Sequence, residues 1–266
     1  MKIVINPKYE FLRDFVTGIL QRSYKVDKTY RNFRNIVEET RVGGVHAVVK
    51  IFKKPTEFNR VVYSFLRPTK AKRSYEYSIR LLKNGIDVPE PIAYLEKFKG
   101  PFFHTGCYIC VYTDYSSIAD FKDINLSDAT QRQRLDSFLT QFSAYVADFH
   151  SKGLVHNDFN IDNILYKETD RTLSFQLIDL NRVQFHNRSL QKCAKDFSSI
   201  HFPDQMMDVI VDRYCMLRNL DKNIFLKKLA RSRGRAKGVT KIKDIVLTPL
   251  GLRKKRPADG ILKKEN

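Results

Sequence analysis

Four polar residues in the middle of the chain, His156, Asp158, Asn163 and Asp179, have the types and spacing that phosphoryl transfer requires. The first three fit the pattern HxDxxxxN, and Asp179 follows Asn163 by sixteen residues. Transfer to a hydroxyl needs a group that accepts the hydroxyl proton and oxygen ligands that hold Mg²⁺ against the β- and γ-phosphates. Asp158 is therefore the candidate proton acceptor, and Asn163 and Asp179 are the candidate magnesium ligands.

The segments around these residues predict a hairpin that follows a long buried helix. Ser127 is the expected N-cap, apolar residues then recur at three- and four-residue steps, and Gly153 ends the helix. The alternating apolar residues of 173–177 predict a strand that delivers Asp179 at its end. The two arms of the hairpin would thus bring the candidate magnesium ligands to one place.

The first third of the chain reads as strands plus one helix. Two β-rich runs, 35–42 and 45–52, flank a pair of glycines that accept the positive φ of a hairpin turn, and Lys50 falls in the second run. Apolar spacing predicts a helix over 70–84, with Glu76 beside its apolar stripe. A basic and an acidic side chain therefore stand on a strand and on a packed helix.

One more strand and several helices are predicted for the rest of the chain. A strand is expected over 107–112, and the polar residues 113–115 that follow it are the expected connection between two lobes. Apolar spacing fits helices over 208–217 and 222–229, and the glycines at 234 and 238 loosen the pattern beyond them.

Taken in order, these parts resemble the protein-kinase superfamily. The run 48–52 is similar to the strand whose lysine holds the α- and β-phosphates of ATP, and Glu76 is similar to its helical partner. The resemblance implies an α+β, two-lobed protein-kinase-like fold, with a β-rich N-lobe over 1–112 and a mainly helical C-lobe over 113–266. It implies nucleotide contacts from Lys50, Glu76 and the connection residues Thr113 and Tyr115.

Departures from the superfamily pattern narrow the expected substrate. Asn157 stands where regulated protein kinases have an arginine that binds a phosphate on the activation loop. Asp179 is followed by Leu-Asn instead of Phe-Gly. The sequence contains neither GxGxxG between the first strands nor GxxxxGK[ST], which excludes a P-loop kinase. It also lacks Ala-Pro-Glu after Asp179, so a small-molecule or glycan hydroxyl is a better acceptor than a protein.

Several stretches resemble the lipopolysaccharide core kinases, which phosphorylate the inner-core sugars Kdo or heptose on lipid A. The resemblance runs from about Arg34 to Phe197, and Arg182 and Asp196 match further family positions, for structural or substrate-orienting roles. It implies a cytoplasmic enzyme, peripheral at the inner face of the bacterial inner membrane, that uses ATP and Mg²⁺ on a lipid-linked inner-core saccharide. The stretches are 48–50, 72–76, 85–91, 153–158 and 177–182.

The charge of the chain is concentrated near its C-terminus. The net charge is +19, and from Met216 onward 16 Lys/Arg stand against 4 Asp/Glu, a net of +12. Such a segment suits an anionic membrane surface or nucleic acid, or is simply a solvated helix face and tail. Two alternatives stay open: a RIO-type atypical kinase or ATPase acting on a ribonucleoprotein, and a non-catalytic pseudokinase binding module with a polybasic anchor.

The cysteines predict neither a disulfide framework nor a metal site. The chain has four cysteines, too few to staple a fold of this length. Cys107 and Cys110 lie in a strand-like run, where an i, i+3 spacing points their side chains to opposite faces. No apolar run approaches the roughly 18 residues of a membrane span.

Overall fold

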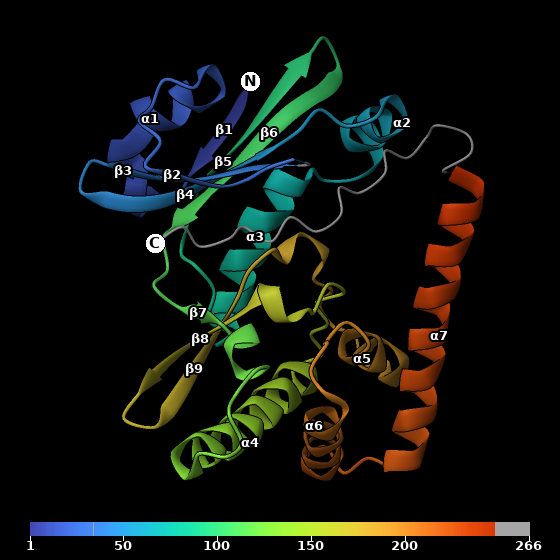
Figure 1. Cartoon of the computed structure of the whole chain (residues 1–266). Coiled ribbons are helices and arrows are strands. Elements are labelled where there is room, and N and C mark those ends of the chain that lie inside the picture. The colour runs from blue at the N-terminus through green and yellow to red at the C-terminus, as the bar shows by residue number, and fades with distance from the viewer. Residues whose placement is uncertain (34, 248–266) are drawn as a thin grey trace.

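The computed structural model describes residues 1–33 and 35–247, and it places an antiparallel sheet at one end of the molecule and a group of helices at the other (Figure 1). The strand order in the sheet is β1-β5-β6-β4-β3-β2. The expected α+β fold with a β-rich first part and a helical second part is therefore confirmed. The basic run at 253–256 lies outside the described residues. The strands are β1 (Lys2–Ile5), β2 (Lys28–Asn32), β3 (Asn35–Val42), β4 (Val45–Phe52), β5 (Pro91–Lys99) and β6 (Phe102–Val111).

The hairpin of β3 and β4 has the bounds that the sequence predicted. Gly43 and Gly44 form its turn with φ of 56° and 75°, a conformation that glycine adopts without strain. A Cβ on Gly43 would also stand 2.8 Å from the side chain of Leu12, so this glycine permits close packing as well. In the register of the sheet, Lys50 stands between Val37 of β3 and Tyr108 of β6, which fixes its strand on both edges.

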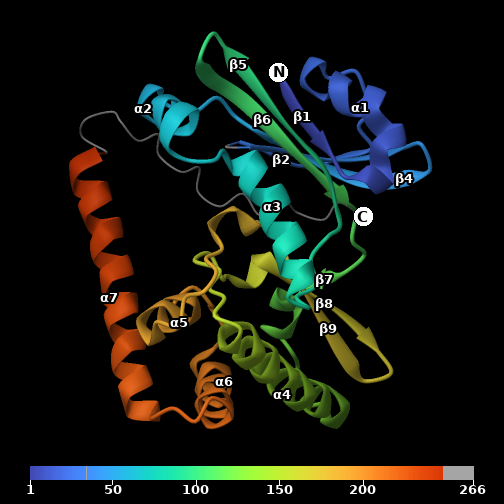
Figure 2. The ribbon, with the colours of Figure 1, turned by 180° about the vertical axis from the view of Figure 1, so that it is seen from behind.

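Helix α3 (Lys70–Lys83) confirms the helix predicted over 70–84 and lies between the sheet and the helical part (Figures 1 and 2). Thr69 caps it, because its hydroxyl accepts a hydrogen bond from the backbone N–H of Lys72 at 3.1 Å. Tyr75 packs with Tyr94 and Tyr108 on this face of the sheet. The helix is thus joined to the sheet while its other side faces the second part of the chain.

Short helices that the sequence did not predict complete the first part. Phe15, Val16 and Ile19 are buried against the opposite face of the sheet from α3. Their segments are too short for a helical period to be recognised, although Asn6 caps η1 and Thr56 caps α2. The elements are η1 (Pro7–Leu12), α1 (Arg13–Gly18), η2 (Ile19–Gln21), α2 (Glu57–Val61) and the π-helical turn η3 (Val62–Leu66).

The second part of the chain is mainly helical, with a small sheet of order β7-β8-β9. Two expectations need correction. The cap of α4 is Asp128 in place of Ser127, because the Asp128 carboxylate accepts from the N–H groups of Thr130 and Gln131, and α7 continues through Gly234 and Gly238 to Leu247. The elements are β7 (Ser116–Ser117), η4 (Ile118–Phe121), α4 (Ala129–Ser151), η5 (Ile161–Asn163), β8 (Ile164–Thr169), β9 (Thr172–Leu177), η6 (Leu180–Arg182), α5 (Leu190–Phe197), α6 (Asp204–Leu217) and α7 (Lys222–Leu247).

Aromatic packing holds the small sheet on α4. Phe138 stacks on Phe121 with ring centroids 3.9 Å apart and on Phe142 at 5.4 Å. Phe142 also contacts Phe175 of β9 at 5.6 Å. The long helix therefore fixes the hairpin of β8 and β9, at whose ends the candidate site residues stand.

Two sequence expectations about the strands and helices can be checked directly. Cys107 and Cys110 are buried in different apolar clusters on the two faces of the sheet, as their spacing predicted. Across the described residues, no helix combines the length and the apolar character that crossing a bilayer needs. The proposed boundary between residues 112 and 113 falls just after β6 and stays a prediction.

Candidate active site

A buried carboxylate holds the turn that carries Asp158. Asp196 of α5 is 1% exposed, and its two oxygens accept hydrogen bonds from the backbone N–H groups of His156 and Asn157, each at 2.7 Å. Asn157 has a φ of 62°, in the left-handed region that costs a non-glycine residue about 1 kcal/mol or more. The two charge-assisted hydrogen bonds offset this strain and fix the direction of the chain into Asp158.

Asn163 links the turn to the two strands of the hairpin. Its side-chain amide donates to the backbone carbonyl of Asp158 at 2.9 Å, and its own carbonyl accepts from the N–H of Ile178 at 3.0 Å. His156 also contacts the carbonyl of Ile178 through Nε2, at 3.0 Å. Because the amide nitrogen of Asn163 is engaged by the turn, its Oδ1 is left as the ligand atom.

Asp179 follows β9 in a left-handed conformation, with φ 57° and ψ 49°. Its Oδ1 accepts from Lys50 Nζ at 2.7 Å and from the side-chain amide of Asn181 at 2.5 Å. Burial raises the pKa of Asp179, but the charge and hydrogen bond of Lys50, with the charges of His156 and Arg182, outweigh it and lower the pKa below its ordinary value. The carboxylate is therefore ionised and ready to hold a cation.

Basic residues surround the two aspartates. Arg182 Nη1 stands 3.3 Å from Asp158 Oδ2, and its side chain is exposed to solvent. Lys70, at the start of α3, has a pKa lowered by burial and by the charge of Arg182, while the charge of Asp179 acts in the opposite direction. Arg73 is buried and donates to the carbonyl of Asn181 at 2.5 Å, which ties α3 to the turn after Asp179. The site therefore presents positive charge beside its carboxylates.

The structure brings together four of the residues predicted from sequence, Lys50, Asp158, Asn163 and Asp179. Glu76 is the exception among the charged ones, because its carboxylate pairs with Lys72 one turn away at 3.6 Å. The expected ion pair of Lys50 and Glu76 therefore stays a prediction for the protein with nucleotide bound.

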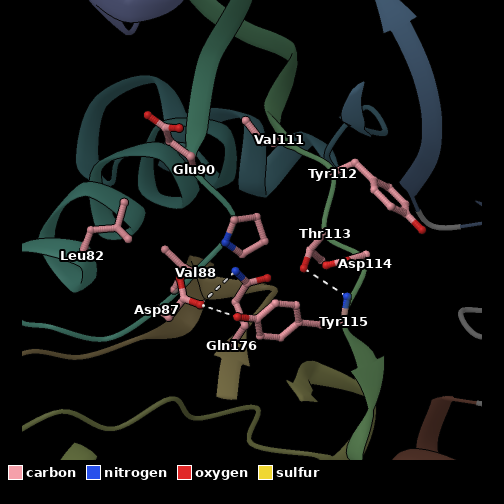
Figure 3. A pocket seen from close by; sticks show the side chains of 11 residues that line it. Leu82, Asp87, Val88, Glu90, Val111, Tyr112, Thr113, Asp114, Tyr115 and Gln176 are labelled. Atoms are coloured by element: carbon pink, nitrogen blue, oxygen red, sulfur yellow. Dashed lines mark hydrogen bonds between the residues drawn. The ribbon is translucent and has the colours of Figure 1, made fainter. Parts of the chain in front are cut away.

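Thr113 and Tyr115 lie in the segment that connects the two parts of the chain. They line a cavity of about 500 Å³ together with residues of the α3–β5 loop and of β9 (Figure 3). Inside it, the Tyr115 hydroxyl donates to Asp87 Oδ2 at 3.4 Å and the Gln176 amide donates to the same oxygen at 3.2 Å. Lys50, Asp158 and Asp179 are not among the lining residues, so this cavity is distinct from the catalytic cluster.

The sequence did not identify several residues that contact and support the site residues. Arg73 and Asn181 lie in stretches that resemble the family, but the sequence assigned them no role, since the contact that joins them spans 108 residues. His150, buried at the end of α4, was also missed, and it contacts Tyr214 at 2.9 Å and Asp196 at 3.4 Å. The only available signal was the position of Asn181 two residues after Asp179.

The donor chemistry of the site fits Mg²⁺. This ion takes one or two protein oxygen ligands and completes its shell with phosphate oxygens and water. Asp179 Oδ2 and Asn163 Oδ1 accept no hydrogen bond from any residue that the structure describes. Within the same residues, no group of three or more His, Cys, Asp or Glu forms a self-sufficient metal cage. Two ligands plus a bound polyphosphate is therefore the arrangement that the residues support.

Comparisons with known proteins identify the family of this chain and its fold. The model of the lipopolysaccharide kinase (Kdo/WaaP) family matches residues 24–213. A solved structure of WaaP in complex with acyl carrier protein is similar in fold, with a TM-score of 0.61 and 18% identity, covering 88% of this chain and 99% of that one. A search of curated proteins finds no match.

Proposed function

The chain belongs to the lipopolysaccharide kinase (Kdo/WaaP) family and is thus an ATP-using phosphotransferase; we propose that it phosphorylates a sugar hydroxyl, of Kdo or heptose, in the lipopolysaccharide inner core. The observation that carries the proposal is the contact of Lys50 with Asp179 at 2.7 Å, across 129 residues of sequence, beside the turn of Asp158. A lysine strand, a metal-binding aspartate and a base are the parts that hydroxyl phosphorylation needs.

Each residue of the cluster has one task in the proposed reaction. Asp158 accepts the proton of the sugar hydroxyl and aligns it for attack on the γ-phosphorus, while ADP leaves with the electron pair of the broken bond. Lys50 exchanges its contact with Asp179 for the α- and β-phosphates of ATP. Its pairing with Asp179 in this structure holds the lysine beside the candidate magnesium ligands until nucleotide binds.

Asn163 and Asp179 would hold the magnesium ion. When bound, the ion neutralises the charge of the β- and γ-phosphates and so supplies electrostatic stabilisation of transfer. The left-handed backbone of Asp179 fixes the direction of its carboxylate. The hydrogen bond from the Asn163 amide to the Asp158 carbonyl fixes the direction of the Asn163 Oδ1. The protein thereby sets the two ligands before the nucleotide binds.

The positive side chains beside Asp158 support an anionic acceptor. Arg182 is exposed and within 3.3 Å of Asp158, and Lys70 is close enough to the site for the charges of Arg182 and Asp179 to act on its pKa. The proposed acceptor carries sugar carboxylates and phosphates on a membrane lipid. We place the enzyme at the cytoplasmic face of the inner membrane, where the basic segment after Met216 would attract that lipid.

Phosphate incorporation with different acceptors tests the proposal. The purified protein is given ATP and Mg²⁺ with Kdo-lipid A, with a protein acceptor, or with no acceptor. Transfer to Kdo-lipid A above the other two is expected. Transfer to protein alone, or a nucleotide hydrolysis that requires structured RNA, would instead support the RIO-type alternative.

A further inference from the structure

The short helices α2 and η3 turn large apolar side chains to solvent. Phe58 is 78% exposed, Phe65 62% and Leu66 79%, and the three form what we name the α2–η3 face. Single exposed apolar residues are ordinary, but several within nine residues of chain form a patch of the kind that marks an interaction site. The catalytic cluster does not use this face.

The α2–η3 face is held in a defined position on the sheet. Ser64 accepts a hydrogen bond from the backbone N–H of Phe103 at 2.8 Å, and Tyr63 packs edge-on against the Phe103 ring at 5.9 Å. The ring of Phe65 rests edge-on against Phe102 at 5.9 Å. Both views show α2 beside β6 (Figures 1 and 2). The inner side of the segment therefore packs, and the outer side is left with its apolar groups uncovered.

Positive charge surrounds this face. Residues 53–70 contain a single acidic residue, Glu57. Its carboxylate already pairs with Lys54 at 3.7 Å and with Arg60 at 2.7 Å. Burial and the charges of nearby lysines and Arg60 together lower the pKa of His104 on the adjoining strand. Lys54, Arg60, Lys97 and Lys99 are the charges that act on His104, Lys99 pairs in register with Phe102, and Lys53 and Arg67 adjoin α2 and η3 in the chain.

We propose that the α2–η3 face docks on an anionic lipid bilayer. Phe58, Phe65 and Leu66 enter the boundary between head groups and acyl chains, and the surrounding lysines and arginines contact lipid phosphates. Interfacial membrane helices combine Phe or Leu on one side with Lys and Arg around it. A protein partner fits less well, because it would have to present acidic side chains on every side of the face, whereas lipid phosphates surround any residue that enters an anionic bilayer.

The position of the face gives docking a consequence for the site. The chain leaves η3 and passes through Pro68 directly into α3, where Arg73 donates to the carbonyl of Pro68 at 3.1 Å and to that of Asn181 at 2.5 Å. The docked surface is thus joined through one buried arginine to the turn that carries Asp179. Docking would hold the first turn of α3 near the bilayer, on the side from which a lipid-linked sugar approaches; this step rests on the proposed function, whereas the docking does not.

An introduced tryptophan provides a direct test, because the chain has no Trp of its own. The full-length Phe65→Trp variant is mixed with phosphatidylglycerol–phosphatidylcholine vesicles whose acyl chains are brominated. We expect its emission to shift to shorter wavelength and to be quenched by the bromines. The matched control is Met216→Trp on α6, whose position is 75% exposed and distant in sequence from the face, and its emission should not be quenched.

A loss-of-binding variant gives the second readout. Replacing Phe58, Phe65 and Leu66 together by Ser should lower vesicle partitioning at least about tenfold, and the loss should persist in high salt, since it removes apolar burial. Replacing Met216 and Leu217 by Ser should leave partitioning close to that of wild type.

Two results would overturn the proposal. One is that the protein sediments with vesicles but the Phe65→Trp emission is not quenched, or the triple variant partitions like wild type. The other is an emission shift produced without vesicles, by raising the protein concentration or adding acyl carrier protein, which would make the face a protein interface. Neither readout contains a phosphate transfer, so failure of the proposed function would leave both unchanged.

Discussion

Replacement of Asp196 by Asn should damage the turn that carries Asp158 without touching any atom that reacts. The Asp196 carboxylate accepts from the N–H groups of His156 and Asn157, and the amide of Asn can accept from only one of them. A hydrogen bond to a charged group contributes about 1.5–3 kcal/mol, and a buried donor without a partner costs about 1–3 kcal/mol. We expect the free energy of unfolding to fall by about 2.5–6 kcal/mol, the sum of the two ranges.

The same variant should change how stability depends on pH. Burial lowers the pKa of His150, but its hydrogen bonds with Asp196 and Cys193 outweigh burial, and the pKa rises above the ordinary 6.5. A raised pKa means that the stabilisation is fully present below pH 6.5 and is lost as pH rises through the folded-state pKa. Without the Asp196 charge, the free energy of unfolding should therefore decrease less between neutral and alkaline pH than it does in the wild type.

Urea unfolding at several pH values measures both effects, with Asp212→Asn as the matched control. Asp212 pairs with Lys222 at 2.8 Å on the surface, where an ion pair contributes about 0–1 kcal/mol. Nucleotide binding and transfer by the folded fraction of Asp196→Asn should both fall, because the turn positions Asp158 and Asn163. If Asp196→Asn costs no more stability than Asp212→Asn and keeps full activity, the account of the turn is wrong.

Three further predictions concern the site and the tail. With Mg²⁺-ATP bound, the side chains of Lys50 and Glu76 should lie within about 10 Å of each other as an ion pair, and a nucleotide-bound structure with a larger separation would contradict their assignment. Because Arg182 stands 3.3 Å from Asp158, Arg182→Gln should lower kcat about 10- to 100-fold with little change in nucleotide affinity, and Arg182→Lys should restore part of it; unchanged kcat in steady-state assays would refute this. Neutralising the four basic residues at 253–256 should remove up to a few kcal/mol, about 1 per residue, of surface attraction, lowering activity on membrane-bound acceptor most at low salt and sparing a saturating soluble acceptor. Loss of RNA binding with unchanged liposome binding would instead make the tail a nucleic-acid device.

Local patterns carried the parts of the fold that were predicted well. The β3–β4 hairpin has turn glycines between two β-rich runs, and α3 has an apolar stripe at helical spacing. Both signals lie within a short stretch of sequence, so they can be recognised without knowing the tertiary contacts. The continuation of α7 through Gly234 and Gly238 could not be read this way, since a glycine weakens a helix by only about 1 kcal/mol and does not end it. The cap of α4 was misplaced by one residue because Ser127 and Asp128 are both good caps.

Contacts between distant segments explain what the sequence could not predict in the site. The HxDxxxxN pattern identified Asp158 and Asn163 because their spacing is local. The partner of Lys50 lies 129 residues away, and in this structure it is Asp179. The anchoring of the turn by Asp196 and of α3 by Arg73 likewise depends on how helices pack, which no spacing in the chain records.

Single-turnover transfer from γ-labelled ATP to Kdo-lipid A, with binding of Mg²⁺-ATP measured on the same samples, tests the central claim most directly. Wild type should bind nucleotide and label the lipid. Asp158→Asn should bind nucleotide with nearly wild-type affinity yet fail to label the lipid, whereas Asp179→Asn should lose affinity as well as transfer. Equal loss of nucleotide affinity in both variants, or labelling of Kdo-lipid A by Asp158→Asn at the wild-type rate, would contradict the proposed roles.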